Sequence, residues 1–257
     1  MDNTIIFSII TVSYNSEKYI RETIESVANQ TYPHIQYIII DGASTDSSVD
    51  IINEYADKLF YWMSEKDNSM YEAINKGLQK ATGDYVLILN SDDVLANNLV
   101  IGEVAKEISK NNSDGYYCNI IKRYSSAEIS IKGFQVGFEQ LLCSENSTFI
   151  PHPCLLVSKK ILQFFPVYNV QYRYASDIDY ILSILSKGFI LKHLDIYLTK
   201  FRIHSDNITS SRKIDSEGKI ILKKYGLFQK NIIYRKVLYY YGWIKYKIIN
   251  KFNTRIK

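Results

Sequence analysis

Two adjacent acids, Asp92 and Asp93, closely follow the apolar run 85–89 of the 257-residue sequence. The run is too short for a typical helix and has Gly83 before it, which predicts a strand buried on both faces. Ligands of open α/β sheets bind outside the carboxyl ends of the strands, where carboxylate oxygens can hold a hard divalent cation. Such a cation could carry a diphosphate. The alternative is that segment 90–93 is a solvated turn that caps a helix.

Polar residues also follow two earlier apolar runs. Tyr14 and Asn15 come after the run 7–13, and Asp41 comes after the run 35–40. The carboxyl ends of neighbouring parallel strands meet at one edge of a sheet, so we expect all these polar groups in one crevice. A carboxylate can accept from a base N–H or from ribose hydroxyls, and a tyrosine can stack. The convergence predicts a nucleotide site, although Asp41 alone could be a turn or capping residue.

Strands and helices alternate along the first hundred residues. The predicted strands are 7–13, 35–40, 59–63 and 85–89. A helix is expected between each pair of successive strands. The expected N-caps are Asn15 or Ser16 for the first helix, Ser44 or Thr45 for the second, and Ser69 for the third. A further helix at 101–108 precedes a less regular half with strands at 114–121 and 128–134. This alternation predicts an α/β fold with a Rossmann-like, mostly parallel central sheet flanked by helices.

The composition is that of a globular protein with 46% hydrophobic residues, enough for a substantial core. Three cysteines without a Cys-x-x-Cys spacing suggest neither a disulfide framework nor a thiolate zinc site, which favours a reducing compartment. The sequence has no signal-peptide pattern and no run of 18 apolar residues. We therefore expect a protein that is neither secreted through a signal peptide nor membrane-spanning.

The positive charge is concentrated in the C-terminal tail. Residues 228–257 contain eight basic residues and no acid, which leaves 23 of the 31 basic residues against all 27 acids. This asymmetry indicates a polyanionic partner, either an anionic membrane surface or nucleic acid. Nucleic-acid binding lacks a supporting fold motif, so we expect no nucleic-acid partner.

A helix over 232–252 would place apolar residues along one face, with Trp243 and lysines beside them. These residues are Ile233, Val237, Tyr241, Ile244 and Ile248. Aromatic, aliphatic and basic residues in this arrangement are typical of a helix that lies on a membrane surface. The alternative is a helix that packs this face on the domain.

Four ordered blocks resemble the successive motifs of family 2 glycosyltransferases. The blocks are SIITVSYN at 8–15, IDGASTD at 40–46, EKDNSMYEAINKG at 65–77 and ATGDYVLILNSDD at 81–93. The resemblance is dense over the first hundred residues and sparse over the next hundred. It implies the nucleotide-sugar-binding GT-A fold, a divalent metal (Mn²⁺ or Mg²⁺) and transfer with inversion at the anomeric carbon.

The resemblance also implies roles for individual residues. The nucleoside would be held by Thr11, Val12, Tyr14 and Asp41, while Asp67 would lie near the donor. The Asp-x-Asp motif of the family is here Asn90-Ser91-Asp92, followed by Asp93. We therefore place Asn90 and Ser91 among the donor contacts. Asp92 is the expected metal ligand, and Asp93 is the competing one.

An inverting transfer needs a base that takes the proton of the acceptor hydroxyl. The segment 174–180 resembles the place where the family carries this base, which makes Asp177 the candidate and Asp179 the alternative. We expect a helix there with Ser176 as its N-cap. Acids in a first turn also stabilise the helix dipole, which is the purely structural explanation.

Two histidines and an arginine complete the predicted site. His204 could finish a metal site or meet a phosphate, and Arg202 could do the second. His152 lies in a segment that resembles the acceptor-side region of the family, as a contact to the donor or acceptor sugar. A lone histidine can also be structural. A catalytic pair of His152 and Cys154 is not expected, because side chains two residues apart on an extended chain point to opposite sides.

The sequence thus predicts a GT-A catalytic domain at 1–212, with a nucleotide half (1–113) and an acceptor half (114–212), and a helical extension at 213–257. The expected reaction transfers a sugar from a UDP-sugar to a lipid-diphosphate-linked or polysaccharide acceptor, for O-antigen (lipopolysaccharide) or capsule synthesis. The expected location is cytoplasmic, peripheral on the inner face of the membrane.

Two alternatives differ in class. One is a nucleotide-sugar-binding protein with an impaired active site, suggested by Asn90 in place of an acid. The other is a sugar-phosphate nucleotidyltransferase, which would need a glycine-rich basic loop that residues 13–19 do not provide. A dinucleotide-dependent oxidoreductase is disfavoured because no Gly-x-Gly-x-x-Gly follows the first strand.

Overall fold

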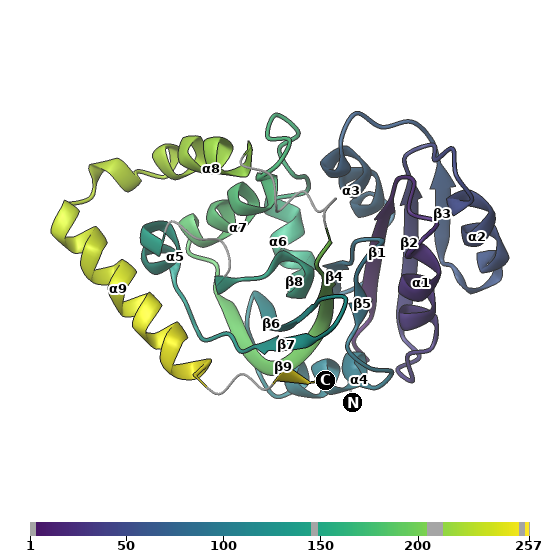
Figure 1. Ribbon diagram of the computed structural model, residues 1–257, viewed down its shortest axis with the longest axis horizontal. Coiled ribbons are helices and arrows are strands. Elements are labelled where there is room, and N and C mark those ends of the chain that lie inside the picture. Colours follow the sequence, from purple (N-terminus) through teal and green to yellow (C-terminus); the bar gives the residue numbers. More distant parts are fainter. Residues whose placement is uncertain (1–3, 145–148, 205–212, 252–254, 257) are drawn as a thin grey trace.

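Four neighbouring strands of one large sheet run parallel, in the order β3-β2-β1-β4. They are β1 (Phe7–Ser13), β2 (Ile35–Asp41), β3 (Tyr61–Ser64) and β4 (Tyr85–Ile88). The computed structural model describes residues 4–144, 149–204, 213–251 and 255–256 (Figure 1). The four predicted strands of the first half are therefore confirmed, and with them the α/β class.

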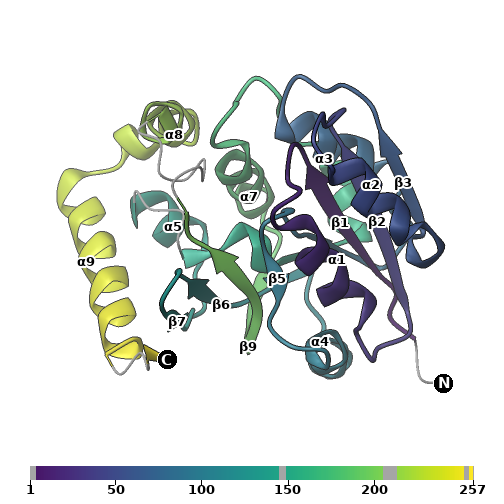
Figure 2. The ribbon, with the colours of Figure 1, turned by 45° about the vertical axis from the view of Figure 1, so that its right-hand side comes forward.

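The second half of the sheet mixes strand directions. The short β8 (Leu155–Ser158) lies antiparallel between β4 and β6 (Gly115–Arg123), followed by β7 (Glu128–Ile131) and β10 (Arg255–Ile256). The long β9 (Leu191–Arg202) runs parallel to β6 and pairs with β5 (Val94–Leu95). Figure 2 shows this curl, with β9 beside β5. The curl brings the end of β9 to the acids that follow β4.

Helices cover both faces of the sheet because β1 buries alternate side chains on each side. On one face Ile9 packs in a cluster with Ile24, and on the other Ile10 packs with Ile74. The helices that contribute to the first face are α1 (Ile20–Ala28), α2 (Ser48–Glu54) and α4 (Val100–Ser109). Those that contribute to the second are α3 (Met70–Leu78), α5 (Phe138–Ser144), α6 (Lys159–Phe164) and α7 (Ser176–Ser186).

One predicted helix cap is confirmed and three are wrong. Ser69 Oγ accepts from the amide of Glu72 at 3.2 Å at the start of α3. Helix α1 begins later than predicted, at Ile20 after Tyr19, and neither it nor α2 has a side-chain cap. Their expected capping residues join neighbouring loops to each other instead, as described below. Ser176 is the first residue of α7, and its buried hydroxyl has no hydrogen-bond partner in the described structure.

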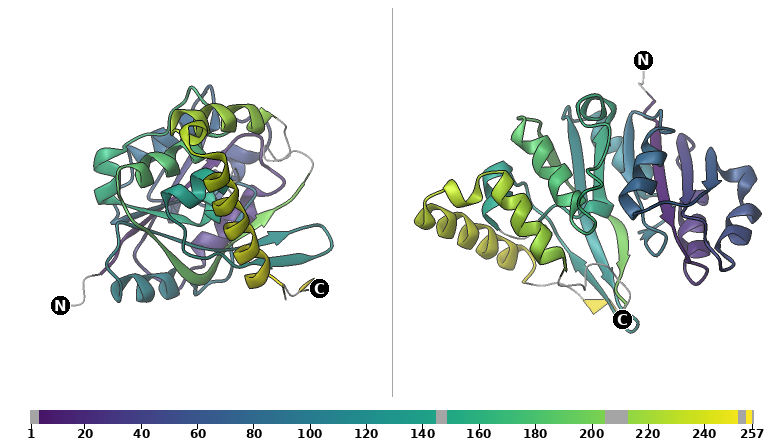
Figure 3. Two further views of the ribbon diagram at one scale, coloured as in Figure 1. Left: turned by 90° about the vertical axis from the view of Figure 1, so that its left-hand side faces the viewer. Right: turned by 90° about the horizontal axis from the view of Figure 1, so that it is seen from above.

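The predicted C-terminal extension contains α8 (Lys213–Lys224) and α9 (Ile232–Ile249). Figure 1 shows α9 at the end of the molecule opposite β3, and the right-hand view of Figure 3 shows the same separation. Helix α9 packs along α5. Gly242 is buried at this contact, where an added Cβ would lie 3.1 Å from the ring of Phe149. Leu238 and Tyr246, one turn to either side of Gly242, also contact the core.

The packed face of α9 is not the predicted apolar face. Ile233, Val237 and Ile248 remain more than half exposed, as does Tyr241, and Ile244 is nearly so. The helix therefore packs on the protein through a different face, and the predicted apolar face stays exposed. Within the described ranges, no helix is both long enough and apolar enough to cross a bilayer.

Candidate active site

Hydrogen bonds join the loops that follow β1, β2 and β4. The amide of Asn15 donates to Ser44 Oγ at 2.8 Å, and the hydroxyls of Ser16 and Ser91 lie 2.7 Å apart. Asn15 accommodates the tight turn with a left-handed φ of 48°. The loops after the three strands therefore meet at one edge of the sheet, as their order in the sequence predicted.

Asp41 lies fully buried at the end of β2. One carboxylate oxygen accepts from Ser44 Oγ at 2.5 Å, and the other accepts from Ser64 Oγ at 2.7 Å and from the amide of Ser44 at 2.9 Å. These three donors fix the carboxylate and use most of its roughly four lone-pair positions. Asp41 therefore organises the loop after β2, and its contact with a nucleoside stays a prediction.

Gly42, Asp67 and Tyr14 lie close together at this edge of the sheet. An added Cβ at Gly42 would lie 2.6 Å from Asp67 Oδ2 and 3.4 Å from Tyr14 Cδ2, so a larger residue would have to displace the Asp67 carboxylate. Burial raises the pKa of Asp67, with the charges of Glu72 and Asp41 adding to it. The ring of Tyr14 is 64% exposed. An exposed ring beside a partly desolvated carboxyl suits the stacking and hydrogen bonding predicted for a nucleotide.

Thr11 and Val12 have their side chains in the interior. Thr11 is fully buried and its hydroxyl lies 3.1 Å from the Tyr37 hydroxyl, while Val12 belongs to the core cluster around α3. A nucleoside contact from either residue would have to come from the main chain.

The acidic cluster after β4 is completed by the end of β9. Asp92 Oδ2 lies 2.8 Å from His204 Nε2, and each side chain is about one-fifth exposed. The imidazole of His204 packs on the ring of Tyr19, with ring centroids 5.3 Å apart. Arg202 Nε donates to the carbonyl of Asp92 at 3.0 Å. Residues 112 positions apart in sequence thus place a carboxylate next to an imidazole.

Asp93 points into the protein. Its carboxyl is fully buried and accepts from the amide of Arg202 at 3.0 Å and from Asn90 Nδ2 at 3.4 Å. Burial, reinforced by the charge of Asp92, raises the pKa of Asp93 well above its usual value. Of the two acids, Asp92 therefore has the accessible carboxylate. The side-chain oxygen of Asn90 is buried, with no hydrogen-bond partner among the described residues.

Arg202 is directed away from the predicted phosphate role. Its guanidinium lies 4.5 Å from the centroid of the Tyr19 ring and forms an ion pair with Glu22, which also pairs with Arg123. Burial opposes the ionisation of Glu22, but the hydrogen bonds from both arginines outweigh it and lower the pKa of Glu22. Arg202 thus links β9 to α1 through Glu22. It could contact a phosphate only if this ion pair were broken.

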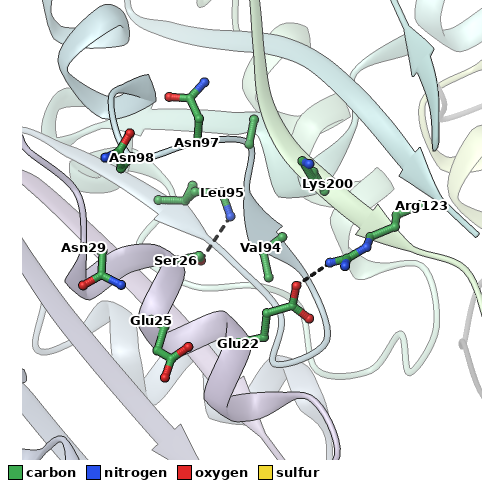
Figure 4. Close-up of a pocket in the computed structure, with 11 residues that line it drawn as sticks. Glu22, Glu25, Ser26, Asn29, Val94, Leu95, Asn97, Asn98, Arg123 and Lys200 are labelled. Atoms are coloured by element: carbon green, nitrogen blue, oxygen red, sulfur yellow. Dashed lines mark hydrogen bonds and ion pairs between the residues drawn. The ribbon is translucent and has the colours of Figure 1, made fainter. Parts of the chain in front are cut away.

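A pocket of about 320 Å³ lies along α1 and β5. Figure 4 shows Glu22 reaching towards Arg123 in this pocket, with Lys200 on the same side. Lys200 forms an ion pair at 3.2 Å with Glu128, which does not itself line the pocket. None of the predicted site residues lines the pocket. Its charged residues hold β6, β7, β9 and α1 together.

Asp177 faces α3 from the first turn of α7. Its Oδ1 accepts from the hydroxyl of Tyr71 at 3.2 Å, and Tyr71 stands on α3, four residues after Asp67. Burial and the charge of Asp177 raise the pKa of Tyr71 well above its usual value, which keeps the phenol protonated as a donor. Tyr71 stacks on Tyr168, which stacks in turn on Tyr180 of α7. This stack fixes α7 against α3.

Asp179 is directed to the other side of α7. It is 6% exposed, and its Oδ1 forms an ion pair with Lys224 of α8 at 2.6 Å. The two candidates for the base are therefore separated: Asp177 faces α3 and Asp179 faces α8.

His152 and Cys154 belong to a 3₁₀ turn (His152–Cys154), not to an extended chain as expected. His152 Nε2 lies 2.9 Å from the hydroxyl of Tyr168, and Cys154 Sγ donates to the carbonyl of Asn119. Burial lowers the pKa of His152 although the charge of Asp177 opposes this, so the imidazole is neutral near pH 7. The two side chains have separate partners and form no catalytic pair.

Two residues near Asp177 were missed in the sequence. Tyr71 lies inside the third resembling block, and its position two residues after Ser69 would have placed it at the helix start. Glu217 lies on α8, and both of its carboxylate oxygens accept amide hydrogens from residues 173–175. Nothing in the sequence links this glutamate to a loop more than 40 residues earlier.

Residues 8–164 match the family model "Glycosyl transferase family 2". The chain is 28% identical to the putative teichuronic acid biosynthesis glycosyltransferase TuaG of Bacillus subtilis, over 80% of this chain and 82% of that protein. It is 27% identical to the UDP-Glc:alpha-D-GlcNAc-diphosphoundecaprenol beta-1,3-glucosyltransferase WfaP of Escherichia coli, over 80% of this chain and 81% of that protein.

Solved structures of other proteins share the fold, and two of them illustrate this. One is S. aureus TarS 1-349 in complex with UDP-GlcNAc, with a TM-score of 0.71 and 18% identity over 96% of this chain and 74% of that one. The other is the mannosyltransferase PcManGT from Pyrobaculum calidifontis in complex with GDP-Man and Mn²⁺, with a TM-score of 0.68 and 13% identity over 95% and 70%. The fold and the family model lead to the same conclusion: the chain belongs to glycosyl transferase family 2 and is a glycosyltransferase with the GT-A fold.

Proposed function

We propose that the protein is an inverting, metal-dependent glycosyltransferase that moves a sugar from a UDP-sugar to a hydroxyl of a lipid-diphosphate-linked or polysaccharide acceptor. The observation that carries this proposal is the pair of Asp92 and His204, 2.8 Å apart at the sheet edge where Tyr14, Gly42 and Asp67 also meet. TarS with UDP-GlcNAc and PcManGT with GDP-Man have the same fold and bind nucleotide-sugars, which supports a nucleotide-sugar donor.

The donor set at Asp92 and His204 fits Mn²⁺ better than Mg²⁺, which prefers oxygen ligands. A carboxylate oxygen and an imidazole nitrogen suit Mn²⁺, and both side chains are accessible. In the part of the chain that the structure describes, no group of three or more His, Cys, Asp or Glu side chains could hold an ion. The remaining ligands would then be diphosphate oxygens and water, as is usual for Mg²⁺ beside phosphates. When bound, the ion would neutralise the charge of the departing nucleoside diphosphate.

Asp177 is the proposed base. A bond forms between the acceptor oxygen and the anomeric carbon while the bond to the diphosphate breaks, and the hydroxyl proton passes to Asp177. Tyr71 donates to Asp177 Oδ1, which orients the carboxylate and leaves Oδ2 for the proton. Asp41, Tyr14 and Asp67 hold and orient the nucleotide.

The acceptor is proposed from the relatives. TuaG is named for teichuronic acid biosynthesis, and the name of WfaP describes an acceptor linked to diphosphoundecaprenol. A lipid-linked acceptor places the reaction at a membrane, and O-antigen or capsule synthesis at the inner face of the cell membrane fits that requirement.

The test is an assay with UDP-sugars and a synthetic polyprenyl-diphosphate sugar acceptor, with and without Mn²⁺. We expect UDP release and glycosylated acceptor only with the metal, and a product whose anomeric configuration is opposite to that of the donor by NMR. UDP binding without turnover of any donor would contradict transfer and support a nucleotide-sugar-binding protein. A product with the donor's own configuration would contradict inversion.

Helix α9 is the proposed membrane contact. Its exposed stripe consists of Ile233, Val237, Tyr241, Ile244 and Ile248, between 49% and 69% exposed. Lys236 and Lys247 are exposed on one flank, and the ammonium of Lys247 lies 5.2 Å from the centroid of the Trp243 ring. Apolar side chains beside aromatic and basic ones suit the headgroup region of anionic lipids.

This contact predicts binding to vesicles that contain phosphatidylglycerol and weaker binding to vesicles of phosphatidylcholine alone. The double variant Val237→Glu/Ile244→Glu should bind at least about tenfold more weakly, because two apolar side chains are replaced by anions. Co-sedimentation at fixed lipid concentration measures this. The matched control is Ile220→Glu, which alters a 59% exposed isoleucine on α8 and should leave binding unchanged. Equal binding of the double variant and the unaltered protein would exclude the stripe.

A further inference from the structure

Glu217 of α8 caps the chain that leads into α7. Its Oε2 accepts from the amides of Tyr174 and Ala175 at 2.7 and 3.0 Å, and its Oε1 accepts from the amide of Arg173 at 2.9 Å. Three amides on one carboxylate form charge-assisted hydrogen bonds, which are stronger than bonds between neutral groups. A residue of the C-terminal extension therefore fixes the backbone two to four residues before Asp177.

Helix α7 has no cap of its own that could do this. Ala175 occupies the N-cap position, and the hydroxyl of Ser176 is buried without a partner in the described structure. No side chain next to the start of α7 therefore fixes the backbone that leads into this helix. Partly buried amides that lose their acceptor become costly to keep in place, so the loop would shift without Glu217.

The position of Asp177 depends on this entry. Its Oδ1 is engaged by two donors, the hydroxyl of Tyr71 at 3.2 Å and the amide of Ile178 at 2.9 Å. The first of these bonds crosses from α7 to α3 and is already long for an O–H donor. A displacement of the first turn of α7 by about 1 Å would break it, and misplacement on this scale can cost about 100-fold in rate.

We propose that Glu217 is a positioning residue for the catalytic base Asp177, acting through the amides of residues 173–175. The inference rests on the proposed function, in which Asp177 accepts the proton. It gives one residue of α8 a role in the reaction, although the predicted division of the chain lies before this helix.

The first test compares Glu217→Ala and Glu217→Gln with the unaltered protein. We expect kcat to fall about 10- to 100-fold in Glu217→Ala, with UDP affinity unchanged because the nucleotide residues lie on other loops. Glu217→Gln keeps one acceptor oxygen and should lie between the two. Asp215→Ala is the matched control, since it removes an exposed acid from the same helix and should keep the original kcat.

A double-mutant cycle identifies the residue through which Glu217 acts. If it acts through Asp177, adding Glu217→Ala to Asp177→Asn should lower the residual rate by less than about threefold, because the base is already lost. Hydrogen exchange of the amides of residues 173–175 should speed up in Glu217→Ala, while exchange in β1 stays slow. The second readout needs no activity and shows that the fold is intact.

The outcomes separate two failures. An unaltered protein that transfers no sugar would overturn the proposed function. An active protein whose Glu217→Ala variant keeps its kcat would overturn only the role of Glu217. The role would also be overturned by a full additional loss of rate in the Asp177→Asn background.

Discussion

Asp177→Asn should reduce kcat by about 10²- to 10⁴-fold and leave the affinity for UDP unchanged, as expected when a general base is removed. The amide cannot take a proton, but its oxygen can still accept from the Tyr71 hydroxyl, now 3.2 Å from Oδ1. The side chain therefore keeps its position and loses only its basicity. Steady-state transfer rates and calorimetric titration with UDP measure the two quantities separately.

Asp179→Asn is the comparison that separates the two acids. Its oxygen can still accept from Lys224, now at 2.6 Å, so we expect a smaller loss of rate than in Asp177→Asn and a lower thermal midpoint from the weakened ion pair. The reverse order of effects would move the base to Asp179. Full activity of both variants would exclude a base in the first turn of α7.

Asp92→Ala should lower kcat/KM by more than about 100-fold and remove the response to Mn²⁺. The variant deletes the accessible carboxylate and leaves His204 as the only remaining member of the pair. A metal that stabilises a departing diphosphate contributes several kcal/mol, and each 1.36 kcal/mol is about tenfold in rate. Titration of activity with Mn²⁺, and treatment of the unaltered protein with a chelator, measure the same dependence in two ways.

Asp93→Asn is the matched control for the metal site. Asp93 is fully buried, and its raised pKa means that the neutral form is favoured relative to an exposed aspartate. An asparagine keeps an oxygen for the amide of Arg202 and removes the acid, so the response to Mn²⁺ should persist. Loss of that response in Asp93→Asn, with its retention in Asp92→Ala, would assign the metal to the buried acid.

The parallel half of the fold was predictable because its strands are buried on both faces. Such strands appear as continuous apolar runs, and β1, β2 and β4 each have polar residues just after them. Their convergence at one edge followed from strand order alone. Ser69 as the cap of α3 was also predictable, because the spacing to Glu72 is local.

The second half was not predictable in this way because its contacts join distant segments. Strand β8 has only four residues and lies between β4 and β6, about 70 and 40 residues away in sequence. The burial of Asp93 and the exposure of Asp92 depend on where β9 brings Arg202. The predicted cap of α7 was wrong for the same reason. The sequence suggested the nearby Ser176, whereas the amides before the helix bind the distant Glu217. The division at residue 212 stays a prediction.

Helix α9 is held along its length and at its end. Gly242 packs against Phe149, and Asn250 exchanges two hydrogen bonds with the main chain of Lys132, at 2.8 and 2.9 Å. If α9 makes the proposed membrane contact, a helix fastened in this way would hold the pair of Asp92 and His204 at a fixed height above the membrane. On a membrane, it would admit only those acceptors whose reacting hydroxyl stands at that height.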